Sequence, residues 1–569
     1  MKKHWRIYLL LVLVCLMGSG ILARLFSLQI LQHDSYSIAA QNQQSIYQEL
    51  LPKRGEIFLQ DLNDKEKYYP LAINKEFKEV YIVPYNISDE EKDGLSDKLS
   101  SMLDLSKDVI LERMNKKNDP YEPLMHKVGQ DIFEKINELV SDGIGFSKEI
   151  WRYYPNNSLA SHLVGFVGID KERKIGQYGL ESYYEKELKG KAGFFAGEKD
   201  TAGFSIPSVG QEKELAQDGA NLILTIDQNV QFQAEKELGL AVEKWQALGG
   251  TIIIMDPKSG AIRAMANLPN FDPNNYSDVE DIDVFLNPSI QKVYEPGSVF
   301  KAFTMAAGLD SNKITPQDVY QDKGSINING SVIRNVDEKA YGEQTMTEIL
   351  EKSLNTGAVF IQQKIGLDVF QDYVERFNFH KTTGIDLVGE VRGNISNLFT
   401  GIDIDLATIS FGQGITVTPI GLITGFAAIA NKGKLMRPFI VEKIIYPDGQ
   451  EQIIEPEVIK QVISSETAKE LSRMLTSVVD NGFGKPAKVL GYSIAGKTGT
   501  AQVPDSEKGG YSEETIHSFI GFAPSFDPEF VILIKLDEPQ GIRFASDSIS
   551  PIFKRLAEYM FSYLEIPPQ

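Results

Sequence analysis

One feature constrains this chain more than any other: a single long apolar run close to its N-terminus. Residues 7–23 are almost continuously apolar, and residues 25–30 remain largely apolar after Arg24. About 20 such residues form a helix that crosses the hydrocarbon core of a membrane, and an arginine near the helix end can reach the interface. Basic residues precede the run: Lys2, Lys3 and Arg6. We therefore expect one membrane-spanning helix with a cytoplasmic N-terminus, and export of everything after about residue 30.

A cleaved signal peptide is the alternative interpretation of this run. Gly18 and Gly20 are small enough for a cleavage site, but the apolar character continues past both, which favours an uncleaved anchor. The only cysteine, Cys15, lies inside the run, so an intrachain disulfide is excluded. A large domain can nevertheless be stable outside the cytoplasm without disulfides.

The remaining chain is too long for one hydrophobic core, since domains usually hold about 100–200 residues. Its composition, 42% hydrophobic and 24% charged, is typical of a globular protein. The net charge of −20 repels a nucleic-acid backbone, so we expect no nucleic-acid partner. The sequence divides into a tail and anchor over residues 1–30, a polar middle domain over 31–215 and a larger domain over 216–569.

Hydrophobic periodicity predicts the elements of both domains. In the middle domain we expect helices over residues 90–111 and 130–140, a strand over 79–83, and loops over the Gly-, Lys- and Glu-rich residues 190–217. The large domain begins with a predicted strand and helix: residues 221–226 and 231–246.

Strand patterns stand at both ends of the large domain, and apolar runs of helical length lie between them. A hairpin is predicted around the turn at 256–260. Its strands and three later ones cover residues 251–255, 261–266, 492–503, 517–523 and 530–536. The helical runs include residues 299–308 and 347–365. This arrangement predicts an α+β fold, in which helices cover an antiparallel sheet.

Ser298 and Lys301 have the spacing of a nucleophile and its base. Pro296 and Gly297 interrupt the chain just before an apolar helical run, so Ser298 falls at a helix start and Lys301 one turn later. A serine hydroxyl needs a base, and a lysine can act as one if burial or a cationic neighbour keeps it neutral. The free N–H groups of a helix start can stabilise an oxyanion. Alone, the pair also fits a capping serine and a surface lysine.

Two further motifs follow in order. Ser353 and Asn355 form Ser-x-Asn, which alone would be a capping serine and a turn asparagine. Lys497 begins Lys-Thr-Gly-Thr on a strand-like segment, which alone would be a strand end with a solvated lysine. The order Ser-x-x-Lys, Ser-x-Asn, Lys-Thr-Gly is the signature of penicillin-recognising serine enzymes.

The third motif has the chemistry of a substrate clamp. On a strand, Gly499 would let a substrate backbone approach closely. Lys497 with Thr498 and Thr500 could hold a carboxylate.

Two other kinds of site are disfavoured. Residues 491–498 match the phosphate-loop pattern, but the positions that should form a loop look like a strand, and the residues after them do not favour a helix. The six histidines are scattered without a His-Glu-x-x-His motif, so we expect no metal and no cofactor.

With these motifs, the sequence resembles a class B penicillin-binding protein over nearly its whole length. Other matching segments are Arg54-Gly-Glu-Ile57, Arg152-Tyr-Tyr-Pro155, Gly179-Leu-Glu181, Leu224-Thr-Ile-Asp227 and Asn287-Pro-Ser-Ile-Gln291. The family often has Asp where Leu59 stands here, with Asp61 further on, which affects local contacts and not the chemistry.

The resemblance implies an elongated pedestal domain over residues 31–215 and a penicillin-binding transpeptidase domain over 216–569. We see no glycosyltransferase motif in the pedestal, which argues against a bifunctional enzyme.

The resemblance also implies roles for individual residues. Ser298 would be the acylated nucleophile and Lys301 its general base. Ser353 would relay a proton to the leaving group, and Asn355 would position the substrate amide.

The third motif and two backbone groups would complete the site. The donor carboxylate would be bound by the segment Lys497, Thr498, Gly499 and Thr500. The backbone N–H groups of Ser298 and Thr500 would form the oxyanion hole.

The implied reaction is peptidoglycan D,D-transpeptidation, with a D-Ala–D-Ala stem peptide as donor, an amine as acceptor and β-lactams acylating Ser298. A polytopic membrane glycosyltransferase is the implied partner. A D,D-carboxypeptidase, a β-lactamase-like hydrolase and a non-catalytic β-lactam sensor stay open on the same scaffold. The anchor and long pedestal argue against a β-lactamase, and a cytoplasmic part of about six residues argues against a sensor.

Overall fold

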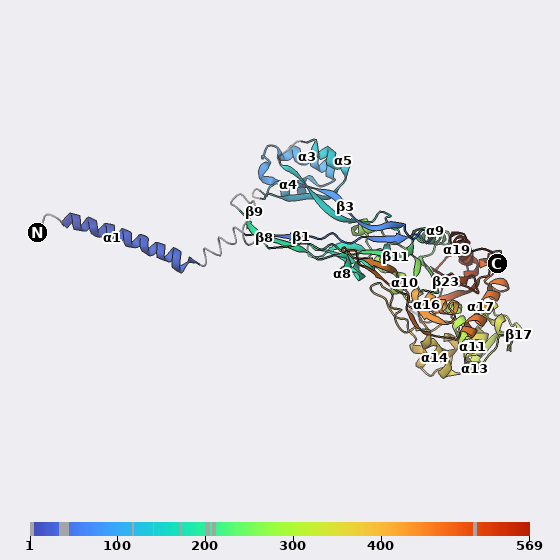
Figure 1. Ribbon diagram of the computed structural model, residues 1–569. Helices are drawn as coiled ribbons and strands as arrows, with labels where there is room; N and C mark the ends of the chain where they lie inside the picture. Colours follow the sequence, from blue (N-terminus) through green and yellow to red (C-terminus); the bar gives the residue numbers. More distant parts are fainter. Residues whose placement is uncertain are drawn as a thin grey trace. The chain divides into compact units, whose positions relative to one another are not determined.

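The computed structural model describes residues 5–33, 45–116, 119–139, 142–170, 173–199, 205–206, 212–504 and 509–568. The chain forms two compact units. The first comprises residues 1–54 and 189–219, and the second comprises residues 55–188 and 220–569. Figure 1 labels their helices and strands.

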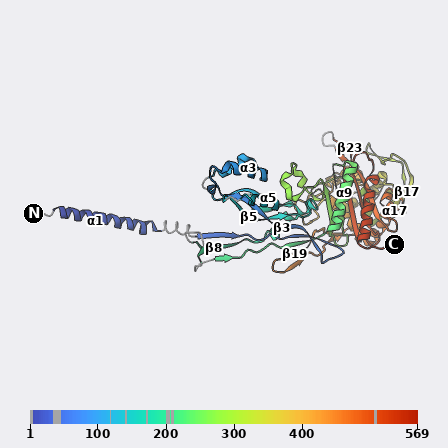
Figure 2. The same cartoon turned by 90° about the horizontal axis from the view of Figure 1, so that it is seen from above.

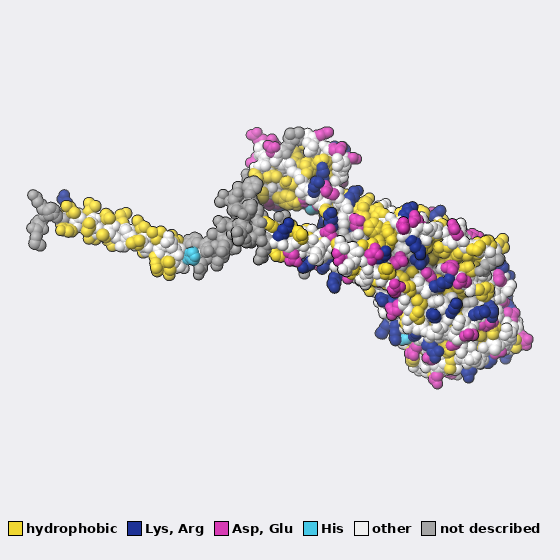
Figure 3. Space-filling view, in the orientation of Figure 1, with side chains coloured by type: hydrophobic (Ala, Val, Ile, Leu, Met, Phe, Trp, Pro, Cys, Tyr) yellow, Lys and Arg dark blue, Asp and Glu magenta, His cyan; other side chains and the backbone are white. Residues whose placement is uncertain are grey.

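The first unit begins with the predicted apolar helix. Helix α1 (Trp5–Phe26) continues into a π-helical turn (Ser27–Leu31), and none of the described side chains of α1 is buried. Apolar side chains cover it in Figure 3. The segment Trp5–Leu31 is long and apolar enough to span a membrane, with a mean hydropathy of 2.4. The helix expected from the sequence is confirmed, and its length and composition suit a membrane anchor.

The rest of the first unit is a small sheet, where loops were expected. Strand β8 (Gly193–Lys199) pairs with β1 (Ser45–Leu50), β9 (Ser205–Ile206) and β10 (Glu212–Glu214). The prediction of loops over 190–217 is therefore wrong. Segment 193–199 gains its main partner from a strand almost 150 residues earlier, and local composition carries no signal of such a pairing.

The second unit contains a mixed seven-stranded sheet that draws on distant parts of the chain. Its order is β20-β19-β11-β2-β3-β4, and β5 also pairs with β3. Their bounds are β2 Ile57–Gln60, β3 Tyr68–Ile82, β4 Glu122–Val128, β5 Ile144–Tyr153, β11 Asn221–Asp227, β19 Val441–Ile445 and β20 Glu451–Ile453. The long pairing of β3 with β5 is visible in Figure 2. Strands from both sides of the expected boundary at residue 215 contribute to this sheet, and that boundary stays a prediction.

Helices α3 (Lys92–Leu103) and α4 (Lys107–Met114) occupy the region where one helix was expected over residues 90–111. Asp104 ends α3 in a left-handed conformation, with φ of 52°, and α4 starts after Ser106 in an extended conformation. A left-handed residue cannot continue a helix, so the apolar periodicity spans two helices. Helix α5 (Gln130–Asn137) confirms the second helix predicted in this region.

A buried ion pair joins three of the segments that matched the family. The Arg152 guanidinium donates to Glu181 Oε1 at 2.6 Å and to the carbonyl oxygen of Gly55 at 2.7 Å. Tyr154 O–H donates to the same Glu181 oxygen at 3.2 Å. The side chains of Arg152 and Glu181 are only 4% and 0% exposed. These segments, far apart in sequence, are held together by one buried ion pair: Glu181 binds Arg152 and Tyr154, and Arg152 binds Gly55.

We expect Glu181→Ala to lower the free energy of unfolding by about 3–5 kcal/mol, because it leaves the Arg152 guanidinium buried without its counter-charge. The exposed pair Lys148–Glu76 supplies a matched control, since its side chains are 74% and 56% exposed. Glu76→Ala should change the stability far less. Chemical denaturation of the full-length protein in detergent measures both. Equal losses in the two variants would contradict a stabilising role for the buried pair.

A five-stranded antiparallel sheet confirms the predicted α+β fold. Its order is β13-β12-β24-β23-β22. The bounds are β12 Gly249–Met255, β13 Ile262–Leu268, β22 Ala495–Pro504, β23 Tyr511–Ala523 and β24 Phe530–Asp537. Strand β22 begins three residues later than expected and includes residues 495–498 of the phosphate-loop pattern, so these residues do not form a loop that leads into a helix.

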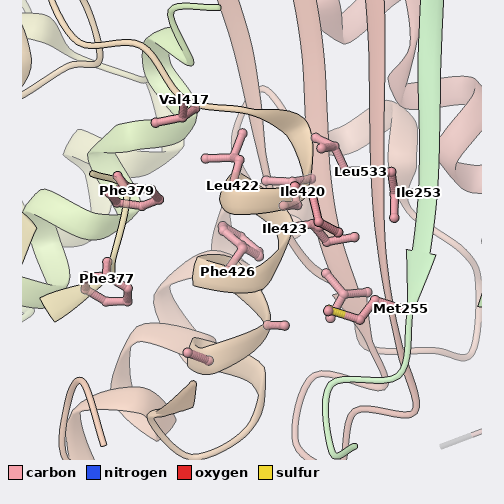
Figure 4. Packing of buried hydrophobic residues seen from close by; sticks show 14 of the residues in the cluster. Ile253, Met255, Phe377, Phe379, Val417, Ile420, Leu422, Ile423, Phe426 and Leu533 are labelled. Atoms are coloured by element: carbon pink, nitrogen blue, oxygen red, sulfur yellow. The ribbon is translucent and has the colours of Figure 1, made fainter. Parts of the chain in front are cut away.

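Helices cover both faces of this sheet. Helices α9 (Gln228–Trp245) and α19 (Ser550–Tyr563) pack on one face, where Ile252 and Ile254 of β12 are buried. Helix α16 (Pro419–Ala430) packs on the other face, against Ile253 and Met255 of the same strand (Figure 4). Successive side chains of a strand point to opposite faces, so the continuous apolar run of β12 reflects burial on both sides.

Two predicted helices are interrupted at the site. The run over 299–308 starts as a 3-10 turn (Gly297–Phe300) and continues as α11 (Lys301–Asp310). The run over 347–365 is divided into α12 (Met346–Glu351) and α13 (Asn355–Ile365). Ser353 lies in the break with a left-handed φ of 54°, a conformation that ends the helical hydrogen-bond pattern.

Candidate active site

The turn before α11 places Ser298 beside Lys301. The Nζ atom of Lys301 lies 2.9 Å from Ser298 Oγ. Gly297 has φ of +54° and donates its N–H to the carbonyl oxygen of Gly412 at 3.0 Å. A Cβ at Gly297 would come within 3.0 Å of Ala501 Cβ, so a glycine fits this turn best. The predicted nucleophile and base are therefore neighbours on a tightly packed turn.

The break between α12 and α13 brings Ser353 to the same lysine. Lys301 Nζ lies 2.5 Å from the Ser353 carbonyl oxygen and 3.2 Å from Ser353 Oγ. Lys497 Nζ on β22 donates to the same hydroxyl at 2.9 Å. Ser353 thus lies between the two lysines, and all three motifs meet around one hydroxyl.

Strand β22 packs closely on the nucleophile turn. A Cβ at Gly499 would lie 2.4 Å from Ser518 Oγ and 2.9 Å from the Pro296 carbonyl oxygen. The sequence explained Gly499 by a close approach of substrate, whereas in the structure neighbouring protein atoms require it. Thr500 Oγ1 accepts the N–H of Ala545 at 3.2 Å, which leaves the Thr500 O–H free to donate to a ligand.

Burial controls the charge of both lysines. Lys301 and Lys497 are 1% and 0% exposed. Burial, together with the positive charge of Lys497, holds the pKa of Lys301 well below its usual value. Burial also lowers the pKa of Lys497 to about 7. A neutral Lys301 has a lone pair that can accept the Ser298 proton.

A cavity of about 150 Å³ opens over these groups. Four predicted residues line it: Ser298, Ser353, Thr498 and Thr500. The buried Lys301 and Lys497 reach it through Ser353. Asn355 is half-buried and does not line the cavity, and its side-chain N–H donates to the carbonyl oxygen of Arg334 at 2.9 Å.

Most of the cavity wall was missed by motif analysis. The additional lining residues are Asn335, Val336, Asp337, Lys352, Phe483, Phe544, Ala545 and Ser546. Lys352 directly precedes Ser353, so the motif itself could have indicated it. Asn335, Val336, Asp337 and Phe483 come from connections after β16 (Ser331–Arg334) and α17 (Ser465–Asp480). Phe544, Ala545 and Ser546 lie at the start of the short helix α18 (Ala545–Ser548), and no local sequence pattern connects the two groups.

Two known protein families match successive parts of the chain. Residues 250–558 match the penicillin-binding protein transpeptidase domain, and residues 49–224 match the penicillin-binding protein dimerisation domain. Stage V sporulation protein D of Bacillus subtilis is 33% identical over 525 residues, which are 91% of this chain and 79% of that protein. Peptidoglycan D,D-transpeptidase FtsI of Escherichia coli K12 is 29% identical over 570 residues, or 99% and 92% of the two chains.

Solved structures share the fold. Penicillin-binding protein 2X from Streptococcus thermophilus has a TM-score of 0.74 at 23% identity, covering 91% of this chain and 80% of that chain. Penicillin-binding protein 3 from Mycobacterium tuberculosis in complex with aztreonam has a TM-score of 0.69 at 25% identity, covering 92% and 98%.

Proposed function

This chain belongs to the class B penicillin-binding proteins, and from that membership we propose how its residues perform the peptidoglycan D,D-transpeptidase reaction named for its relatives. The observation that most supports the assignment is the 2.9 Å separation of Lys301 Nζ and Ser298 Oγ, in surroundings that lower the pKa of the lysine and so favour its neutral form. The relatives are named transpeptidases and penicillin-binding proteins, which favours this activity over the carboxypeptidase, β-lactamase and sensor alternatives.

Acylation begins with proton transfer from Ser298 Oγ to the lone pair of Lys301. The oxygen attacks the carbonyl carbon of the donor D-Ala–D-Ala bond, and the backbone N–H groups of Ser298 and Thr500 stabilise the oxyanion. The C–N bond then breaks. The proton passes from Lys301 through Ser353 Oγ to the departing amino group, and D-Ala leaves. The contacts of Ser353 with both lysines support this relay.

The donor carboxylate binds at β22. The side chains of Lys497, Thr498 and Thr500 would surround it, because the free O–H of Thr500 and the ammonium of Lys497 both donate. The side-chain nitrogen of Asn355 donates to the carbonyl oxygen of Arg334, so the side-chain oxygen of Asn355 remains to accept the substrate N–H.

Deacylation uses an amine acceptor. Attack by the amine forms the cross-link and returns Ser298 to its free state, whereas attack by water would give carboxypeptidase products. A β-lactam follows the first half of this sequence, with its ring carbonyl in place of the donor carbonyl.

We expect the full-length protein, supplied with a D-Ala–D-Ala stem peptide and a peptide carrying a side-chain amine, to form the amide-linked product. Mass spectrometry of the products measures this. Release of D-Ala by water alone, at every amine concentration, would make the protein a carboxypeptidase. Many turnovers per second of a chromogenic β-lactam would make it a β-lactamase.

We also propose the orientation of the anchor and a membrane partner. Lys2, Lys3 and Arg6 favour a cytoplasmic N-terminus, which places the catalytic domain outside. Protease added to intact cells should then digest the catalytic domain, and protection of that domain would reverse the orientation.

The implied partner is a polytopic membrane glycosyltransferase that makes the donor strands. Replacing Trp5–Leu31 by an unrelated spanning helix should weaken their co-purification, and unchanged co-purification would argue against contact through the anchor.

A further inference from the structure

We propose that Asp337 forms the docking site for the protonated primary amine of the acceptor peptide. This inference rests on the proposed transpeptidation and assigns a recognition group to its second substrate. Asp337 lines the same cavity as Ser298, and it is the one carboxylate among the described residues that line it. An alkylammonium ion entering this cavity would find its counter-charge there.

The charged groups at the cavity differ in what they are free to bind. Thr498 and Thr500 line the cavity, and the buried Lys497, which donates to Ser353, adjoins them in the chain, which suits the donor carboxylate. Two charged side chains belong to the lining itself: Asp337 and Lys352. Lys352 is already engaged, because its Nζ lies 3.1 Å from Glu348 Oε1 and also donates to Gln344. Asp337 is therefore the charge in the lining that remains for a second substrate.

The Asp337 carboxylate is held in place but not covered. Tyr341 O–H donates to Asp337 Oδ2 at 2.5 Å, and the backbone N–H of Lys339 donates to Oδ1 at 3.3 Å. The Lys339 ammonium is 4.0 Å away and 73% exposed, so it screens Asp337 weakly. The Asp337 side chain is still 32% exposed, which leaves room for an incoming cation.

A buried carboxylate fixes the loop that carries Asp337. Asp322 is 1% exposed and accepts hydrogen bonds from the Asn335 side chain at 3.0 Å and from the Tyr341 backbone N–H at 2.9 Å. It also accepts the Thr356 O–H at 2.8 Å, at the start of α13. The loop on both sides of Asp337 is thus tied to the helix that carries Asn355, so the carboxylate has a fixed place relative to the catalytic motifs.

The chemistry needs a docking group that acts before bond formation. The bound ammonium loses one proton to solvent, and the neutral nitrogen attacks the acyl carbon of the Ser298 ester. The new C–N bond replaces the C–Oγ bond, and a second proton from nitrogen returns to Ser298 Oγ through Lys301. Asp337 raises the local concentration of acceptor and takes no proton. Its loss should therefore raise the KM for the acceptor and leave the kcat of amide formation nearly constant.

The test compares Asp337→Asn, Asp337→Glu and wild-type full-length protein with one stem-peptide donor and increasing acceptor. The readout is the ratio of amide to hydrolysis product, which does not depend on the fraction of active enzyme. We expect Asp337→Asn to raise the acceptor KM about three- to fivefold, the range of one partly exposed ion pair. Asp337→Glu keeps the negative charge and should have an acceptor KM close to that of wild type. Glu338→Gln is the matched control, because it removes the neighbouring exposed carboxylate outside the cavity.

The dependence of the product ratio on salt provides a second readout. Raising the ionic strength to about 0.5 M should lower the wild-type ratio of amide to hydrolysis product toward that of Asp337→Asn, and should barely change the ratio in that variant.

Three results would overturn the assignment: an unchanged acceptor KM in Asp337→Asn, an equal change in Glu338→Gln, or a wild-type product ratio independent of salt. If wild type forms no amide at all, the proposed transpeptidation fails. If wild type forms amide and Asp337→Asn matches it, only the docking site fails.

Discussion

Replacing Ser298 by alanine is expected to abolish covalent labelling of the full-length protein by a fluorescent penicillin. The acyl-enzyme requires an oxygen at this position, and removal of a catalytic serine costs at least about 10⁴-fold in rate. The fold should persist, because the change removes one hydroxyl from a turn whose backbone is held by Gly297 and Gly412. Gel fluorescence after a fixed exposure, with thermal unfolding of the same samples, measures both effects.

Ser311 supplies the matched control for that substitution. It lies just after α11, the helix that follows the turn with Ser298, and its hydroxyl donates to the Ala307 carbonyl oxygen at 2.6 Å, away from the cavity. Ser311→Ala should label like wild type. Persistent labelling of the Ser298→Ala protein would move the nucleophile to another residue and remove the basis for the roles of Lys301 and Ser353.

Lys301→Ala is the second change with a large expected effect. Loss of a positioned general base costs about 10²–10⁴-fold in acylation rate. Lys301→Arg should not restore the rate, because a guanidinium stays protonated and cannot accept the Ser298 proton. Lys313→Ala, an exposed lysine just after the same helix, should behave like wild type. Stopped-flow acylation by a chromogenic β-lactam measures all three variants.

The same assignment predicts how acylation depends on pH. Because burial and the charge of Lys497 depress the pKa of Lys301, the neutral base persists to lower pH than an ordinary lysine, and the rate should fall as pH drops through that lowered pKa. Above about 7, Lys497 loses its proton, so binding of the substrate carboxylate should weaken as pH rises. The acidic fall should be absent from the residual activity of Lys301→Ala. A rate that is flat from acid to alkaline pH, with activity retained in Lys301→Arg, would contradict a neutral lysine base.

The sequence located the chemistry better than it located the walls around it. Helical spacing placed Ser298 and Lys301 on one helix face, but by itself it fitted a capping serine and a surface lysine equally well. Placing Ser353 and Lys497 beside them required the order of the motifs, since nothing local connects segments 144 residues apart. Phe483, Phe544 and Asp337 were missed because each lies in an irregular connection, where no periodicity marks a lining position.

The errors in the fold have two physical origins. Residues 193–199 form a strand through pairing with residues 45–50, and composition does not report a partner so distant. Helix breaks at Asp104 and Ser353 depend on single residues in left-handed conformations, which non-glycine residues adopt seldom. The apolar pattern continues across both breaks, so periodicity predicts one helix where the structure has two. Gly499 was predicted to let a substrate approach closely, and the atoms that lie close to it in the structure belong to the protein.

The most direct test of the whole account is the mass of the intact protein after exposure to penicillin, followed by mapping of the adduct to a peptide. We predict one added penicillin per chain, on the peptide that contains Ser298 and on no peptide of the Ser298→Ala protein. An adduct on any other peptide, or an unmodified chain after prolonged exposure, would contradict the convergence of the three motifs on one acylated serine.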